Sequence, residues 1–597
     1  MENENYSTAF YKARLAELSI ELKKYSRRSK IWAIIRLITF IGVAVLAYTT
    51  YPYNGYSVLM IIASLLLFLY FVRKSAENKE QLNFVKALIL INENEIKSSK
   101  QDYSAFNDGK EYIDPNHAFS YDMDVFGENS FFQLFNRTVT QTGEKKLVAY
   151  LLNGTQNRKE NIEAIDELTE HKTWYQGYLA YGSTLEKDEA EVNISEVIEK
   201  PFPYQSWVKV ARFVLPIFAI SISALYYFDI ISGLQFLIAA VLLLLPIRQT
   251  LKTTNEAHKA LSNIGKRAKA ISNQLEYMET VSFKSDLLKQ YQNELFKQKE
   301  NGKVGLKKLS QLVKEAEYRD NILVAIFLNF FFAWDLRLLM KIKEWKDVYG
   351  DKVKRWEEIV YDMESLISGA NFRMNFKDHT TIPEITQNEQ EEHIKLVELG
   401  HPIIPLKKLI KNNFILPPTK QFAIITGPNM AGKSTFLRSI GINLMLAHAG
   451  FHVFAKEFVF PNRKLYSSMR TSDNLKDETS YFHAELLRLR FIMDAIEQGE
   501  QVFIILDEIL KGTNSKDKEE GSSKFLQKLN QLKVKGIIAT HDLSLTNLTD
   551  QYPSIINQYF DTEIKGEEIS FDYTIRDGVA KNMNASFLLR KMGLIDK

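Results

Sequence analysis

The segment Gly-Pro-Asn-Met-Ala-Gly-Lys-Ser, residues 427–434, constrains the fold of this chain more than any other part of its sequence. An apolar run, 422–425, precedes it, and a helix-like stretch, 435–449, follows it. A glycine loop between a strand and a helix cradles phosphate, because backbone N–H groups crowd around the oxygens and the helix dipole favours negative charge there. The flanking elements argue against a chance match. The sequence therefore predicts a P-loop in an α/β domain that binds a nucleoside triphosphate.

Each residue of the loop has an expected place in such a site. Lys433 would reach the β- and γ-phosphates, and the Ser434 hydroxyl would ligate Mg²⁺. The other residues of the loop are expected to surround the nucleotide; they are Gly427, Pro428, Asn429, Met430, Ala431, Gly432 and Thr435.

Two further apolar runs end in polar residues that suit the same chemistry. The run 502–506 leads to Asp507 and Glu508, and ligands of open α/β sheets bind at such C-terminal strand ends. We expect Asp507 to hold the hydration shell of Mg²⁺ and Glu508 to polarise the attacking water, because phosphoryl transfer needs little beyond positioning and charge stabilisation. A third strand, 536–540, ends at His541, which is placed to sense the γ-phosphate. A lone strand-end histidine is commonly structural, but the two preceding motifs favour a catalytic role for His541.

These motifs carry a family resemblance. The loop 426–435 resembles the P-loop of MutS-type ATPases, where Pro-Asn-Met is distinctive, and further similar segments lie at 401–402, 449–453, 472–475, 480–485, 507–513 and 539–541. The resemblance implies an ABC-type, MutS-like domain that uses ATP and Mg²⁺. It also implies that Ser480 belongs to a segment that contacts nucleotide held by a partner subunit, although Glu478 and Thr479 replace the family's usual Gly-Arg. The alternative for Ser480 is a helix N-cap.

Outside the ATPase region the resemblance is looser. Residues 134–147 and 157–168 resemble the start of the MutS core, or lever, domain, and 573–586 resemble the end of MutS ATPase domains. The resemblance covers about 125–200 and 255–590. No mismatch-reading domain, Phe-x-Glu wedge or full DNA clamp is evident, and the chain ends soon after the ATPase without a dimerisation extension. Mismatch recognition is therefore not implied.

Four apolar runs in two tight pairs predict membrane-spanning helices. The first pair is Ile31–Tyr53 and Tyr56–Val72, and the second is about 213–228 and 230–247. Each is near the roughly 20 residues that a spanning helix needs. Buried core helices are the alternative, and the pairing with charged flanks argues against it.

Basic residues at the ends of these runs predict the orientation. They flank both pairs on one side, whereas the turn 52–55 carries no charge. Because basic ends stay in the cytoplasm, both hairpins would project outward from a multi-pass protein of the cell (inner) membrane, with its soluble parts in the cytoplasm. No cleavage site is evident, so the first run is predicted to be an anchor. The basic residues are Lys23, Lys24, Arg27, Arg28, Lys30, Arg73, Lys74, Lys209, Arg212, Arg248 and Lys252.

A shorter apolar run, Ile322–Trp334, lies between two aspartates. At about 13 residues it is too short to span a bilayer. We therefore expect a buried helix of the core domain here.

Composition bounds the remaining possibilities. The 597 residues include no cysteine, which excludes disulfides and thiolate metal sites. The formal net charge of +3 neither requires nor excludes nucleic acid. The lysine-rich stretch 252–308 includes a cluster, Lys266, Arg267 and Lys269, which is either a solvated helix face or a surface that contacts phosphates of DNA. The polar, turn-rich stretches 98–124 and 368–400 are candidate linkers.

The sequence thus predicts a membrane-anchored, MutS-related ATP hydrolase. We expect an α/β P-loop NTPase domain (396–597) joined to an all-α lever or core domain (125–395), which the second hairpin interrupts, after an N-terminal membrane-anchor region (1–124). The protein would act as a homodimer, contact lipid through four helices, and bind DNA with low sequence specificity. The alternatives are an ATP-gated membrane scaffold without DNA binding and an ATP-driven transporter, which the lack of a Leu-Ser-Gly-Gly signature disfavours.

Overall fold

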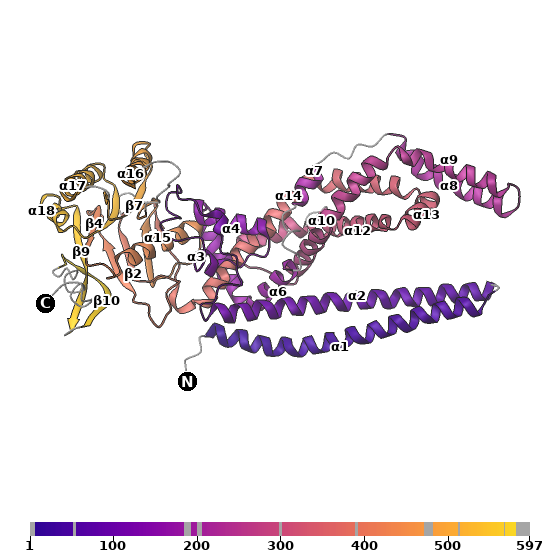
Figure 1. Cartoon of the computed structure of the whole chain (residues 1–597), viewed down its shortest axis with the longest axis horizontal. Helices are drawn as coiled ribbons and strands as arrows, with labels where there is room; N and C mark the ends of the chain where they lie inside the picture. The colour runs from indigo at the N-terminus through magenta and orange to yellow at the C-terminus, as the bar shows by residue number, and fades with distance from the viewer. Residues whose placement is uncertain are drawn as a thin grey trace. The chain divides into compact units, whose positions relative to one another are not determined.

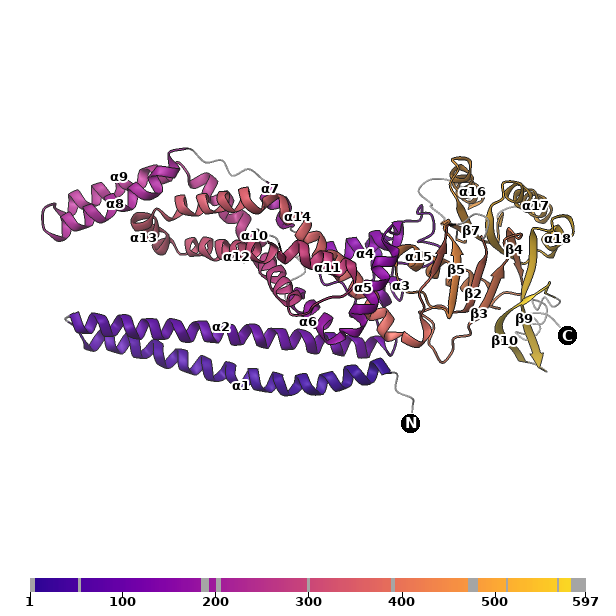
Figure 2. The ribbon, with the colours of Figure 1, turned by 180° about the vertical axis from the view of Figure 1, so that it is seen from behind.

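The structure is a computed structural model that describes residues 6–51, 55–183, 193–199, 206–297, 301–387, 392–470, 481–511, 514–565 and 568–580. The chain divides into two compact units. Unit 1 consists of Met1–Ile96, Thr138–Lys146 and Glu170–Ser365, and unit 2 consists of Lys97–Arg137, Leu147–Thr169 and Leu366–Lys597. Figures 1 and 2 show the ribbon from opposite sides.

Unit 2 holds the strands that the described residues form, together with shorter helices. The helices are α3 (Phe131–Phe135), the second half of α4 (Gln141–Asn153), most of α5 (Arg158–Glu170), the end of α14 (Trp334–Asn375), α15 (Lys433–Ala449), α16 (Tyr481–Glu497), α17 (Ser515–Gln531) and α18 (Leu548–Gln551). The strands are β1 (Glu384–Thr386), β2 (Ile394–Leu399), β3 (Asn412–Leu416), β4 (Phe422–Thr426), β5 (Glu457–Pro461), β6 (Lys464–Ser468), β7 (Val502–Asp507), β8 (Lys535–Thr540), β9 (Ile555–Lys565) and β10 (Glu568–Asp577).

A six-stranded sheet forms the centre of unit 2, in the order β10-β9-β4-β8-β7-β6. The neighbouring strands from β9 to β6 are parallel, and β10 is antiparallel to β9. Ile424, Ile505 and Ile538 are fully buried, as expected of parallel strands covered on both faces. Because β4, β8 and β7 run in one direction, the segments that follow them meet at one edge of the sheet. A second sheet, in the order β1-β5-β2-β3, also belongs to this unit.

The segment 97–137 packs against the rest of unit 2. Asp122 accepts hydrogen bonds from Ser467 Oγ (2.6 Å) and from the Arg470 backbone N–H (2.9 Å). The Met123 side chain lies so close to α15 that a Cβ on Gly441 would be 2.1 Å from its sulfur. The predicted linker at 98–124 is therefore wrong, because this segment packs against the rest of unit 2 through residues such as Asp122 and Met123.

Unit 1 is helical throughout its described residues. A face of α10 packs on α12, where Gly265 allows Val313 to approach within 2.5 Å of the position a Cβ would take. Buried residues of α10 recur every three or four positions, as in Leu261, Ile264 and Ala268, which is the period of one helix face. The helices are α1 (Tyr6–Thr49), α2 (Gly55–Ser98), α6 (Lys172–Gly182), α7 (Ile194–Glu199), α8 (Val208–Tyr227), α9 (Gly233–Arg248), α10 (Leu251–Met278), α11 (Asp286–Gln292), α12 (Gly302–Glu317), α13 (Ile322–Phe332) and most of α14.

Two apolar hairpins extend from the body of unit 1. In α1–α2 the rings of Trp32 and Phe71 are 6.0 Å apart, and in α8–α9 the rings of Tyr226 and Phe236 are 5.0 Å apart. Among the described residues, α1, α2 and α8 are long and apolar enough to cross a membrane. The 16-residue α9 is long enough to cross a membrane only when it is counted together with α10, and the two helices are bent by 64° relative to each other. Few residues of the most apolar stretch of each helix are buried in the protein: 0% of that stretch in α1 and 6% in α2.

The prediction that 322–334 forms a buried core helix is wrong in part. The helix exists as α13, but Ile322 is 73% exposed and Phe327 is 55% exposed. The inner side of α13 contacts α8 and α9. The expectation failed because an apolar run too short to span a bilayer was assumed to lie in the protein core.

The cluster at 266–269 is divided between buried and exposed side chains. Arg267 is 1% exposed, its Nε lies 3.7 Å from the Glu357 carboxylate, and its guanidinium donates to the Tyr361 hydroxyl. The side chain of Lys269 is 41% exposed and forms an ion pair with Glu80, and the side chain of Lys266 is exposed. The prediction is therefore wrong for Arg267, which belongs neither to a phosphate-contacting surface nor to a solvated face.

Candidate active site

The P-loop lies between β4 and α15, as the sequence predicts. Gly427 has φ 145° and Gly432 has φ 107°, conformations that residues with a Cβ rarely adopt. A Cβ on Gly427 would also lie 2.6 Å from the Phe560 carbonyl oxygen. Met430 has φ 68° and a side chain that is 79% exposed, so the middle of the loop faces outward.

Lys433 is the first residue of α15 and folds back over its own loop. Its ammonium donates to the carbonyl oxygens of Gly427 (2.7 Å) and Pro428 (2.9 Å). Burial lowers the pKa of Lys433 to about 8, although the nearby carboxylates of Asp507 and Glu508 oppose that shift. The loop thus holds a cation that is costly to keep charged without an anion beside it.

Ser434 and Asp507 bring two oxygen ligands together. The Ser434 hydroxyl donates to Asp507 Oδ2 at 2.5 Å, which joins the start of α15 to the end of β7. A hydroxyl and one carboxylate fit Mg²⁺, which keeps several waters and takes its other ligands from substrate phosphates. Within the described ranges no group of three or more His, Cys, Asp or Glu side chains could enclose a metal ion by itself. The donor set therefore suits Mg²⁺ held jointly with nucleotide.

Glu508 and His541 face each other across the ends of β7 and β8. The distance between His541 Nε2 and Glu508 Oε1 is 3.2 Å, and between His541 Nε2 and Lys433 Nζ it is 3.4 Å. Burial, followed by the charge of Lys433, lowers the pKa of His541 below its usual value, so the ring is neutral at pH 7. One nitrogen of a neutral imidazole cannot both donate to Glu508 and accept from Lys433. The shorter distance favours donation to Glu508.

Glu508 has a strained backbone. Its φ is 51°, in the left-handed region that non-glycine residues seldom occupy, and its N–H donates to the Ala539 carbonyl at 2.9 Å. Such outliers persist only where surrounding contacts impose them, and they concentrate at functional sites. The hydrogen bond to β8 thus fixes the direction in which the Glu508 carboxylate leaves the strand.

Two residues that no motif of the sequence indicated also shape this site. The Glu485 carboxylate, on α16, accepts hydrogen bonds from the backbone N–H groups of Leu510 and Lys511 and so holds the loop after Glu508. Tyr573, on β10, packs beside the P-loop, 3.1 Å from the position that a Cβ on Gly432 would take. Both lay in segments that carried the family resemblance, but nothing in their spacing indicated these contacts.

The remaining predicted residues divide by position. Pro428 and Ala431 are buried, whereas Asn429 and Thr435 are exposed. The structure thus brings the loop, Asp507, Glu508 and His541 together at one edge of the sheet. Ser480 lies outside the described residues, so its predicted contact with a partner's nucleotide stays a prediction.

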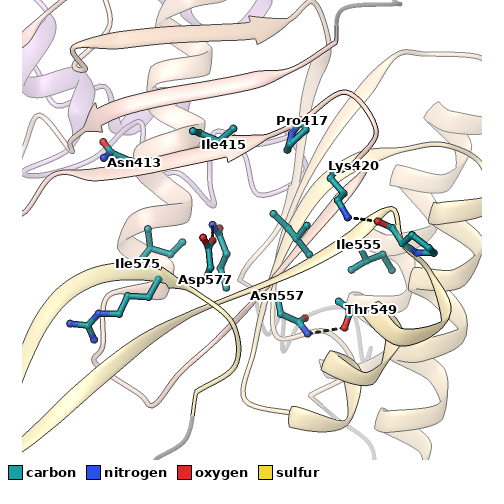
Figure 3. A pocket seen from close by; sticks show the side chains of 13 residues that line it. Asn413, Ile415, Pro417, Lys420, Thr549, Ile555, Asn557, Ile575 and Asp577 are labelled. Carbon is teal, nitrogen blue, oxygen red and sulfur yellow. Dashed lines mark hydrogen bonds between the residues drawn. The ribbon is translucent and has the colours of Figure 1, made fainter.

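A separate cavity of about 800 Å³ lies elsewhere in unit 2, between β3 and the β9–β10 pair (Figure 3). Lys420 and Pro553, which precede β4 and β9, contribute to its lining, and no residue of the P-loop does. Asn557 Nδ2 donates to Thr549 Oγ1 at 3.1 Å within this lining. The cavity is therefore distinct from the expected phosphate site.

Comparison with known proteins agrees with this geometry. A family model described as MutS domain V matches residues 423–590. The DNA mismatch repair protein MutS of Thermotoga neapolitana is 29% identical over 193 residues, which are 32% of this chain and 24% of that protein. The human MutS protein homolog 4 is 27% identical over 235 residues, 38% of this chain and 25% of that protein.

A longer match has the same character. The DNA mismatch repair protein MutS of Persephonella marina is 28% identical over 268 residues, 44% of this chain and 30% of that protein. The matches thus span about a quarter to a third of the length of these relatives. Within the matched region lie the P-loop, Asp507, Glu508 and His541. Residues 423–590 therefore form a MutS-family ATPase domain.

Proposed function

We propose that this protein is a membrane-anchored ATPase that hydrolyses MgATP as a dimer and converts nucleotide state into movement of its helical region. The observation that carries the proposal is the meeting of Lys433, Ser434–Asp507 and Glu508–His541 at one sheet edge. The three functional regions would be the membrane-anchor region 1–124, the lever region 125–395 and the ATPase region 396–597.

The chemistry follows from the positions of these side chains. When ATP enters, Lys433 exchanges its bonds to Gly427 and Pro428 for the β- and γ-phosphate oxygens, which are stronger, charged acceptors. Ser434 and Asp507 would hold Mg²⁺, which supplies charge neutralisation across the phosphates when it is bound. Glu508 orients the attacking water, and His541, which donates to Glu508, keeps that carboxylate in place and meets the γ-phosphate.

Membrane anchorage rests on the two hairpins of unit 1. Their apolar stretches are exposed over lengths close to the roughly 20 residues that cross a bilayer. Water would meet a large apolar area if these hairpins stayed in solution, which soluble proteins avoid. We propose four spanning helices, both turns outside, and the ATPase in the cytoplasm, on the side of the basic residues.

Dimerisation and DNA binding are proposed from the similarity to MutS proteins. Ser480 would contact nucleotide held by the partner subunit. Binding to DNA would rest on phosphate contacts, because no mismatch-reading element is evident in the sequence. Arg267 cannot supply these contacts, because it is buried and held by Glu357 and Tyr361 within unit 1.

The deciding experiment is the ATPase rate of the full-length protein in lipid nanodiscs, with and without perfect duplex, branched and mismatched DNA. We expect Mg²⁺-dependent hydrolysis that the Glu508→Ala variant lacks, and stimulation by DNA whose affinity for the protein falls by orders of magnitude between about 50 and 200 mM salt. Hydrolysis without any response to DNA would favour an ATP-gated membrane scaffold. Stimulation by a membrane solute in place of DNA would favour a transporter.

A further inference from the structure

We propose that α13 is a re-entrant membrane helix, which enters the bilayer beside the α8–α9 hairpin, exposes its outer face to lipid chains and returns without crossing. This inference rests on the proposed insertion of α8–α9. It assigns a lipid contact to a segment that would otherwise be an exposed apolar helix of a soluble core.

The outward face of α13 carries apolar side chains alone. Ile322, Ile326 and Phe327 are 73%, 51% and 55% exposed, and Val324 and Phe332 are also exposed. Asn329, the polar residue of the helix, is half-buried, and its Oδ1 accepts from the Asp335 backbone N–H at 2.9 Å. The most exposed side chains of α13, Ile322, Ile326 and Phe327, would enter hydrocarbon without taking a polar group out of water.

The inner side of α13 continues the surface of the hairpin. The ring of Phe330, which is buried, lies 6.1 Å from the ring of Phe236. Phe236 belongs to the first turn of α9, near the turn that joins α8 to α9. The contact between Phe330 and Phe236 therefore lies in the apolar part of the hairpin, away from the basic residues at its other end. Figures 1 and 2 both show α13 beside α8–α9. If the hairpin is in the bilayer, α13 is at a depth where lipid chains surround it.

Both ends of the segment return to one polar layer. Arg319, just before α13, and Asp335, just after it, form an ion pair of 2.9 Å between Nε and Oδ1. Asp320 lies 3.2 Å from His258 of α10, and Trp334 Nε1 donates to the Glu315 carbonyl. Charged residues with a tryptophan beside them are typical of the boundary between membrane and water. The segment thus leaves the polar layer and rejoins it at the same place.

The length and the backbone of α13 fit this path. Eleven helical residues extend about 16 Å, which is too short to cross the roughly 30 Å of hydrocarbon. Asn321 caps the first turn, where its Oδ1 accepts from the Val324 N–H at 3.3 Å, and the Ala333 N–H donates to the Asn329 carbonyl at 3.0 Å. A lipid-exposed segment requires such internal pairing, because hydrocarbon offers no partner to backbone groups.

The absence of cysteine allows a direct test with single-cysteine variants. A nitroxide label would be placed at Phe327→Cys in the full-length protein in phosphatidylcholine–phosphatidylglycerol nanodiscs. Leu237→Cys, exposed on α9, is the hydrocarbon reference, and Val304→Cys, exposed on α12, is the aqueous reference. Ile322→Cys gives a second position on α13. Unchanged ATP hydrolysis would verify that each labelled protein is folded.

The measured quantity is the ratio of collision rates with oxygen, which concentrates in hydrocarbon, and with a water-soluble nickel chelate. We expect the ratio at Phe327 to match that at Leu237 and to exceed that at Val304 several-fold, with Ile322 between them. An aqueous ratio at Phe327 and Ile322, with a hydrocarbon ratio at Leu237, would overturn the re-entrant helix and leave the spanning hairpin in place. An aqueous ratio at Leu237 as well would overturn the proposed anchorage. Exclusion of both reagents from Phe327 would show that protein, and not lipid, covers α13.

Discussion

Lys433 and Glu508 lie within one site but are expected to serve different steps, nucleotide binding and hydrolysis. Lys433 is bonded to loop carbonyls that a phosphate would replace, so its charge belongs to nucleotide binding. The Glu508 carboxylate pairs with His541 at the end of β8. The two residues should therefore separate binding from hydrolysis when each is removed.

Substitution of these two residues should give different defects. We expect Lys433→Ala to abolish tight ATP binding, because a buried cation that meets the phosphates is lost. Glu508→Ala should bind ATP with nearly normal affinity but slow turnover by several orders of magnitude, because only the orientation of water is lost. Equilibrium binding of a fluorescent ATP analogue and single-turnover hydrolysis measure the two effects. Equal turnover in wild type and Glu508→Ala would remove Glu508 from the mechanism.

The affinity for ATP should depend on pH through Lys433. With its pKa lowered to about 8, the free protein loses the Lys433 proton above that pH, whereas bound phosphates require the charged form. Binding must then include proton uptake, so the Kd for MgATP should rise up to about tenfold per pH unit above pH 8 and stay level below it. Titrations of the wild-type protein with a non-hydrolysable ATP analogue from pH 7 to 9.5 measure this slope. Lys433→Arg, which stays charged, should show no slope if it binds, and a level Kd in the wild type would contradict the assignment.

At the scale of elements, the contact between α4 and α14 gives a structural reason for residues of the segment 134–147, which resembles the start of the MutS core domain. Glu364 Oε2 accepts hydrogen bonds from the Val139 and Thr140 backbone N–H groups and from Thr140 Oγ1, at 2.9 to 3.2 Å. A Cβ on Gly143 would lie 2.3 Å from that oxygen. The carboxylate of one helix thus caps the start of another, and the glycine makes room for it.

The buried Glu364 should make stability depend on pH. Burial raises its pKa to about 7, against the hydrogen bonds from Thr140 and Val139, which lower it. Between roughly pH 4.5 and 7 the folded protein therefore holds a proton that the unfolded chain releases, so stability should fall as pH rises through this window and level off above it. Glu364→Gln cannot titrate and should lose this slope. Denaturant midpoints at pH 5 and 7.5 measure it, with the exposed Glu344→Gln as the control, which should keep the slope; an unchanged slope in Glu364→Gln would refute the role.

Which elements the sequence could predict depends on the range of the interactions that define them. The P-loop, β7 and β8 were predictable because a buried strand followed by its functional residue is a local pattern, as in Val502–Asp507. Arg267 could not be placed, because its partners Glu357 and Tyr361 lie some ninety residues away on α14. Segment 98–124 was mistaken for a linker for the same reason, since Asp122 meets Ser467 only through the tertiary fold.

At the scale of the whole molecule, the apolar surface of unit 1 has to be accounted for. The apolar stretches of α1, α2 and α8 are largely unburied in the protein. Both hairpins begin and end in basic residues, with Lys30 and Arg73 at the first and Arg212 and Arg248 at the second. A bilayer is the environment that satisfies both features at once.

Reporters should reveal the resulting topology. A tag inserted near Lys100, or a reporter fused after Lys597, should be cytoplasmic, and a tag between Tyr53 and Tyr56 should be accessible from outside, because basic ends remain inside. Protease protection in spheroplasts and inverted vesicles measures each position. Four apolar helices should also keep the protein in the membrane during carbonate or high-salt washes. Release by these washes, or an internal location of the 53–56 tag, would contradict the arrangement.

Unit 2 is assembled from three separate stretches of chain, Lys97–Arg137, Leu147–Thr169 and Leu366–Lys597. During synthesis, residues 97–137 emerge early, yet the helix and strand that Met123 and Asp122 contact, α15 and β6, are made more than three hundred residues later. Domains generally fold as units as they emerge from the ribosome. Unit 2 would therefore be completed last, after both hairpins have been synthesised.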